Sequence, residues 1–148
     1  MKLLFILPYS PVPANTGNKN LTFNLLKYMN EKVKFDLILI LEKSINKKDV
    51  YNMIKQAYNN VENIYIYNTN SGINYFIHRI SLMVRFLHPS LAKYYNFDLD
   101  MWLRKNSSSY SIIHFDMYPT SSYLPYIKST PTILVASDAY SMAAKTVV

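Results

Sequence analysis

The amino-acid sequence predicts an α/β fold: a Rossmann-like, doubly wound, mostly parallel five-stranded sheet with helices on both faces. Strand-like and helix-like segments alternate along the chain. The expected strands are short, continuous apolar runs, which are typical of parallel strands covered on both faces. The chain has 148 residues, of which 50% are hydrophobic, so it is long enough to form one domain with its own core.

The first four elements are two strands, each followed by a helix. The first apolar run stops at a proline-rich loop, because proline cannot donate to a sheet ladder. The first helix is indicated by Leu21, Leu25 and Tyr28, which share one face, and the second has Ser44 or Asn46 as a cap. In chain order the predicted elements are the strand Lys2–Leu7, the helix Gly17–Asn30, the strand Phe35–Leu41 and the helix Ile45–Asn60.

The middle of the chain continues the alternation. A third apolar run is followed by turn residues that end at Gly72, and an apolar stripe then indicates a helix that stops before Pro89. A further helix is expected after this proline. The predicted elements are the strand Glu62–Tyr67, the helix Ile73–Leu87 and the helix Ser90–Lys105.

Two further strands complete the sheet. A polar turn precedes the fourth apolar run, and a proline-containing segment with a short helix connects it to the fifth. These elements are the strand Ile112–Phe115, the short helix within Pro119–Ile127 and the strand Thr132–Ala136. Ligands of such sheets bind beyond the carboxyl ends of the strands, which points to the loops at 8–20, 116–120 and 137–140.

The loop after the first strand could hold a phosphate or a sugar. Gly17 and Asn18 tolerate a positive φ, so the backbone can turn sharply and present its N–H groups. A helix start attracts anions, and Lys19 adds a positive charge. Alternatively, the glycine only permits the turn into the helix. The loop lacks the second glycine of the dinucleotide-binding and P-loop patterns.

The other two loops place acidic residues at strand ends. Asp116 and Asp138 can reach into the crevice, or each can cap the segment that follows it. His114 lies inside an apolar strand and is either a core residue or a site residue. No metal-ligand spacing connects the histidines, and the chain has no cysteine, so neither a metal site nor a cysteine nucleophile is expected.

The charge of the chain allows three explanations. Sixteen basic and nine acidic residues give a net charge of +7. Asn, Ile, Tyr and Lys, which have AT-rich codons, make up 56 residues, whereas Ala, Gly, Pro and Arg make up 19. Genome composition therefore explains the charge best, ahead of an anionic membrane surface and of nucleic acid. The stripe of Ile73–Leu87 packs on the sheet or lies on a membrane surface.

Several segments together resemble the N-terminal part of bacterial family 4 glycosyltransferases, over nearly the whole chain. They are Met1–Pro13, Thr16-Gly17, Lys19, Thr22–Lys27, Ile112–Asp116, Tyr123–Pro125, Pro131–Val135 and Ser137-Asp138. The resemblance implies a GT-B fold, in which two Rossmann-like domains face each other across a cleft. It also implies sugar transfer from a nucleotide-sugar donor, with retention and without a metal or other cofactor. Residues 1–148 would then be the single N-terminal, acceptor-side domain.

The resemblance also suggests roles for individual residues. Gly17, with Asn18 and Lys19, would approach the donor phosphates, and Asp116 would lie near the transferred sugar as the catalytic residue. Asp138 and His114 would line the acceptor side. Asn18 stands where the family has a second glycine, and Leu21 where a basic residue is common. The glutamate pair of the C-terminal domain is absent, because Glu31, Glu42 and Glu62 are the only glutamates.

The expected function is therefore the acceptor-side half of a hexosyltransferase that is inactive alone. Its partners would be a nucleotide-sugar donor, a glycan or lipid-linked acceptor, and a C-terminal donor-binding domain in cis or in trans. Nucleic acid is not expected. The alternative is a non-catalytic, acceptor-binding or membrane-docking subunit of a split glycosyltransferase. The expected location is the cytoplasm, with peripheral contact at the inner face of the membrane left open.

Overall fold

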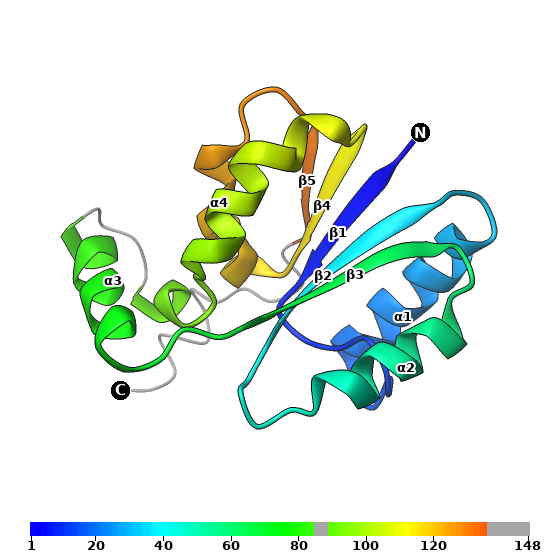
Figure 1. Ribbon diagram of the computed structural model, residues 1–148, viewed down its shortest axis with the longest axis horizontal. Helices are drawn as coiled ribbons and strands as arrows, with labels where there is room; N and C mark the ends of the chain where they lie inside the picture. Colours follow the sequence, from blue (N-terminus) through cyan, green and yellow to red (C-terminus); the bar gives the residue numbers. More distant parts are fainter. Residues whose placement is uncertain (85–88, 136–148) are drawn as a thin grey trace.

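The expected fold class is confirmed by a computed structural model that describes residues 1–84 and 89–135 (Figure 1). These residues form a five-stranded, all-parallel sheet with the strand order β3-β2-β1-β4-β5. The strands are β1 (Leu3–Leu7), β2 (Phe35–Leu41), β3 (Val61–Asn68), β4 (Ile112–Asp116) and β5 (Thr132–Val135). The helices are α1 (Gly17–Asn30), α2 (Lys47–Ala57), α3 (Gly72–Val84) and α4 (Phe97–Asn106), with 3₁₀ segments η1 (Pro89–Lys93), η2 (Ser107–Ser109) and η3 (Tyr118–Tyr126).

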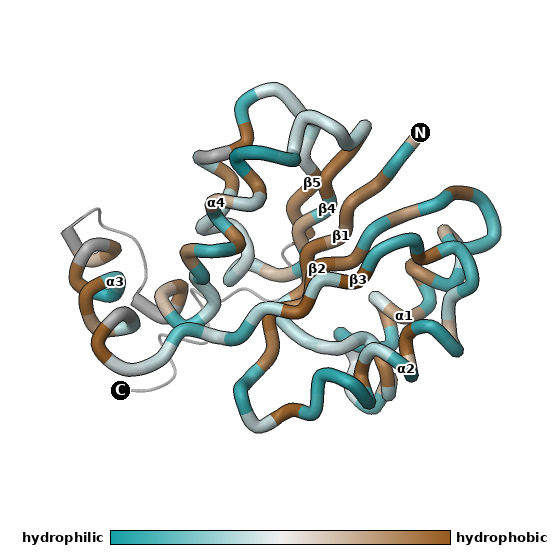
Figure 2. Tube along the Cα trace, viewed as in Figure 1, coloured by the Kyte–Doolittle hydropathy of each residue, from teal (hydrophilic) through white to brown (hydrophobic). Residues whose placement is uncertain are grey.

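Helices lie on both faces of the sheet, as expected from its apolar strands. Alternate residues of β1 point to opposite faces: Leu3 and Phe5 belong to a core shared with α1 and α2, whereas Leu4 and Ile6 belong to a core shared with α4 and η3. All residues of β1 and β2 are buried. Figure 2 accordingly shows the middle of the sheet in the colours of hydrophobic residues. The sheet thus holds the carboxyl ends of its strands at one rigid edge.

The predicted helix Ser90–Lys105 is wrong, because the chain forms two separate segments there, η1 and α4. Asn96 is extended and caps α4: its side-chain oxygen accepts a hydrogen bond from the N–H of Leu99 at 3.1 Å. Its side-chain nitrogen donates to the carbonyl of Asn68 at 3.1 Å, at the end of β3. A residue that caps one helix while it holds a strand end cannot continue the preceding helical turn.

The other boundaries differ less. The bounds of α1 and β2 agree with the prediction, and α2 is shorter than Ile45–Asn60 because Asn46 caps its start, accepting from the N–H of Lys48 at 3.0 Å. The ends of the predicted helix Ile73–Leu87 and of the predicted strand Thr132–Ala136 lie outside the described residues. Within the described parts of the chain, no helix has the length and apolar character needed to cross a bilayer.

A fully buried carboxylate, Asp36 of β2, ties together the amino end of the sheet. It forms an ion pair with Lys2 at 2.9 Å and accepts a hydrogen bond from the hydroxyl of Tyr110 at 2.6 Å. It also accepts from the backbone and side-chain nitrogens of Asn63 at 3.1 and 3.0 Å. Of these partners, Lys2 precedes β1, Asn63 lies in β3 and Tyr110 precedes β4. Since Asp36 lies at the amino end of the strands, its role is structural.

Candidate functional site

Three side chains from distant parts of the chain meet at the carboxyl edge of the sheet. The Tyr9 hydroxyl donates to Oδ2 of Asp116 at 2.5 Å. The Thr22 hydroxyl donates to the same oxygen at 2.6 Å, and the two hydroxyl oxygens are 2.8 Å apart. We call Tyr9, Thr22 and Asp116 the edge cluster. Because both hydroxyls contact Oδ2, they fix the orientation of the carboxyl group without occupying its other oxygen.

The local structure explains why these residues meet. Tyr9 follows the end of β1, Asp116 is the last residue of β4, and β1 pairs directly with β4. Thr22 lies in the second turn of α1, and its hydroxyl is also 3.1 Å from the Asn18 carbonyl. The capping alternative for Asp116 is not observed, because its carboxylate bonds to Tyr9 and Thr22 and η3 begins without a side-chain cap.

The backbone directly after Asp116 is strained. Met117 has a φ of 65°, a conformation that costs a non-glycine residue about 1–3 kcal/mol. Hydrogen bonds hold it there: its N–H donates to the Val135 carbonyl at 2.8 Å, and its carbonyl accepts from the Thr120 hydroxyl at 2.8 Å. Such strain is more frequent at functional sites than elsewhere, so it marks this edge of the sheet as a candidate site.

The first turn of α1 lies beside the edge cluster. A side chain added at Gly17 would meet nothing within 4 Å, and Gly17 does not have the positive φ considered above. The backbone therefore does not require glycine here, and the space above it is open. In the described chain, Thr16 makes no side-chain capping bond to α1, and the start of a helix attracts anions through its dipole. Asn18 and the half-buried Lys19 follow directly.

His114 lies one strand repeat before Asp116 on the same face of β4. Its ring packs on Phe5, with ring centroids 5.0 Å apart, and lines a mostly apolar cavity of about 380 Å³ between α1 and the strands. Burial lowers the pKa of His114, an effect that the nearby Asp116 carboxylate partly opposes. The position favours a core residue that is neutral at pH 7.

The lowered pKa predicts a pH-dependent stability. The unfolded chain binds more protons than the folded chain between the lowered pKa and the ordinary value of 6.5, so the free energy of unfolding should fall as the pH drops through this window. His114→Leu should reduce that slope. Urea unfolding of the unaltered chain and of the variant at pH 7.5 to 5, in roughly half-unit steps, measures the change. An unchanged slope in His114→Leu would contradict the prediction.

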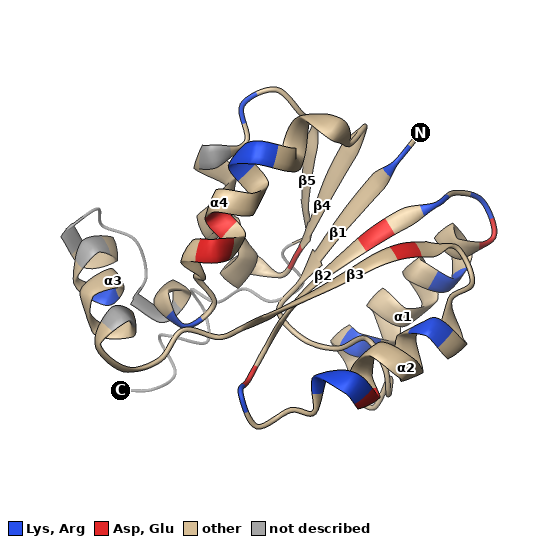
Figure 3. Cartoon of the chain, viewed as in Figure 1, with Lys and Arg blue, Asp and Glu red and all other residues tan. Residues whose placement is uncertain are grey.

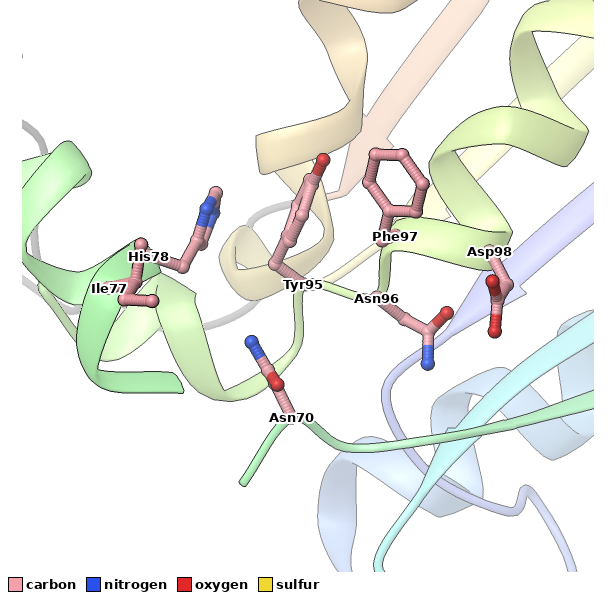
Figure 4. Close-up of a pocket in the computed structure, with 7 residues that line it drawn as sticks. All are labelled: Asn70, Ile77, His78, Tyr95, Asn96, Phe97 and Asp98. Atoms are coloured by element: carbon pink, nitrogen blue, oxygen red, sulfur yellow. The ribbon is translucent and has the colours of Figure 1, made fainter. Parts of the chain in front are cut away.

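A larger hollow of about 600 Å³ lies between the ends of β3, α3 and α4 (Figure 4). Its ring stack was not expected from the sequence: His78 stacks on Tyr95 at 3.8 Å, and Tyr95 lies over Tyr123 at 5.7 Å. Tyr123 belongs to η3, the segment that follows Asp116, and does not itself line the hollow. The hollow is lined by Asn70, Ile77, His78, Tyr95, Asn96, Phe97 and Asp98.

The sequence identified Asp116 but missed Tyr9 and Thr22 as its partners. Thr22 lies four residues after Asn18, so the two residues share one face of α1. Because Asn18 was already expected at the site, this spacing was the available signal for Thr22. Asp138 and the rest of the loop at 137–140 lie outside the described residues. Among residues 1–84 and 89–135, no group of three or more histidines and carboxylates is arranged to hold a metal ion. No family model, curated protein or solved structure matches this chain.

Proposed function

We propose that this chain is the acceptor-side domain of a nucleotide-sugar-dependent, retaining glycosyltransferase and works with a donor-binding domain in cis or in trans. The observation that carries the proposal is the edge cluster: an oriented carboxylate at the carboxyl edge of a Rossmann-like sheet, beside the start of α1. Ligands of doubly wound sheets bind at this edge. The resemblance of the surrounding segments to family 4 glycosyltransferases supports the same reaction class.

Each side of the site has a distinct task. The first-turn N–H groups of α1, with Lys19, attract the donor diphosphate through the helix dipole and a positive charge. The Asp116 carboxylate accepts a hydrogen bond from a sugar hydroxyl at the reacting centre, while Tyr9 and Thr22 prevent its rotation. Rate enhancement then comes mainly from placing donor and acceptor together. The donor is a substrate, and the expected location is the cytoplasm.

The donor side can be tested on the chain itself by nitrogen-15 NMR titration with uridine and guanosine diphosphates. Binding should shift the amide signals of Gly17, Asn18 and Lys19. Lys19→Gln should weaken binding about threefold, as expected for one cation at a helix start. Lys27→Gln, at the far end of the same helix, is the matched control. Shifts confined to other parts of the chain, or equal effects of the two variants, would contradict the proposal.

If the chain is an acceptor-side domain, we expect that it transfers no sugar alone, since a separate domain would have to supply the donor-binding side of the cleft. Incubation with nucleotide sugars and glycan or lipid-linked acceptors, followed by mass spectrometry of the acceptors, measures this directly. Turnover by residues 1–148 alone would show that the site is complete without a second domain.

A further inference from the structure

Helix α3 exposes a long apolar surface. Ile73, Phe76, Ile77, Ile80 and Met83 are 48% to 77% exposed, and we call these five residues the α3 stripe. At about 100° per residue they lie on one side of the helix. Figure 2 shows hydrophobic colours along much of the described helix. Single exposed apolar side chains are common, but a contiguous group indicates an interaction surface.

The opposite side of α3 is packed, so the stripe is held facing outward. Leu82 is almost fully buried against Leu91 and Ala92 of η1, and Tyr75 and Tyr118 pack around them. Leu82 and Tyr75 lie roughly half a turn of the helix away from the stripe. Figure 1 shows that α3 lies at one end of the molecule, away from α1 and α2. A broad surface can therefore approach the stripe.

We propose that the α3 stripe docks this protein on an anionic phospholipid membrane, independently of the proposed glycosyltransferase activity. Its side chains are aliphatic, aromatic or thioether groups, which enter the boundary between headgroups and acyl chains. The sequence of α3 contains Arg79 as its one formally charged residue and no carboxylate. Arg79 flanks the stripe, where its charged end can reach anionic headgroups while its stem follows apolar surface.

The surrounding charge favours an anionic membrane over a neutral one. Lys43 and Lys93 line a hollow at the start of α3, together with Glu42, which pairs with Lys93 at 2.7 Å. Lys43 and Lys93 lie on the Tyr75 side of α3, so Arg79 is the cation that flanks the stripe on the helix itself. Each cation near an anionic leaflet contributes about 1 kcal/mol of attraction. Figure 3 shows no acidic position on the drawn part of α3.

The stripe also continues into the 600 Å³ hollow, because Ile77 belongs to the stripe and lines the hollow as well. Phe97, which is 65% exposed, lies on the same hollow. A membrane on the stripe would place this hollow beside the headgroup layer, where an amphiphilic molecule could enter without leaving the bilayer.

The test is cosedimentation of the 148-residue chain with phosphatidylcholine vesicles, with and without phosphatidylglycerol. We expect binding to the anionic vesicles that weakens as salt is raised, because screening reduces the headgroup attraction. The triple variant Phe76→Gln, Ile77→Gln and Ile80→Gln should bind at least about tenfold more weakly, since it loses apolar insertion. A control triple variant replaces exposed residues on α1, α2 and α4: Tyr28→Gln, Tyr51→Gln and Met101→Gln.

Several outcomes would overturn the proposal. One is the absence of binding to anionic vesicles at low salt, and another is an equal loss in the control variant. A third is a dimer in analytical ultracentrifugation that the α3 variant dissociates while neither protein binds vesicles, because the stripe would then join two copies of the chain. Circular dichroism checks that each variant folds. If the triple variant does not fold, Ile73→Gln, at the most exposed stripe residue, carries the same test with a smaller expected loss.

Discussion

Replacing Asp36 with alanine is expected to lower the free energy of unfolding by about 3 kcal/mol. The substitution leaves the Tyr110 hydroxyl and the nitrogens of Asn63 without their acceptor, and it removes the ion pair with Lys2. The loss is large because the carboxylate is fully buried, so water cannot replace the missing oxygen atoms without opening the sheet. Chemical denaturation followed by circular dichroism measures the change.

The matched control is Asp49→Ala. Asp49 lies in the first turn of α2 and is exposed, so its removal should cost no more than about 1 kcal/mol, the usual contribution of an acidic residue at a helix start. Equal effects of the two substitutions would mean that the Asp36 network adds nothing beyond its charge. Because Asp36 lies at the end of the sheet opposite the candidate site, Asp36→Ala should not alter nucleotide binding in protein that remains folded.

Asp116→Asn is expected to lower sugar transfer more than tenfold, or by about 1.4 kcal/mol of transition-state stabilisation, in the enzyme assembled with its donor-binding domain. Asparagine keeps the shape of the side chain but replaces one carboxylate oxygen with a donor. It can no longer offer a negatively charged acceptor to a sugar hydroxyl. Initial rates at saturating donor and acceptor report the loss in kcat.

Two further variants separate catalysis from structure in this cluster. Tyr9→Phe removes one of the two hydroxyls that orient the carboxylate and should lower kcat less than Asp116→Asn does. Glu31→Gln, at the end of α1 that is remote from Thr22, should leave kcat unchanged. Near-wild-type kcat in folded Asp116→Asn would show that the Asp116 carboxylate only fastens β4 to α1.

The strands and the first helix were predictable because their signals are local. The bounds of α1 and β2 agree with the sequence-based prediction, since helical spacing and a continuous apolar run each identify one element. The structural role of Asp36 was not predicted, because this residue lies inside an apolar run that indicates only a buried strand. Its partners come from three other segments, and no local pattern connects them.

The candidate site was only partly predictable for a related reason. Asp116 could be identified because strand ends carry ligands in this fold, whereas Tyr9 is 107 residues away from it and is one of 14 tyrosines. The orientation of helix α3 could not be predicted either. Periodicity identified its apolar stripe but not which face packs, and the packing is made by Leu82 and Tyr75 on the other side.

The central position of β1 has a consequence for synthesis on the ribosome. β1 is made first, yet one of its two neighbours, β4, lies far along the chain; Lys2 and Ser111, which hydrogen-bond there, are 109 residues apart. While the chain emerges, β1 can pair with β2, but its other edge stays unpaired and apolar until residues 112–116 appear. The nascent β1-β2-β3 half thus has an unpaired apolar edge, which makes it the stage of synthesis most prone to aggregation.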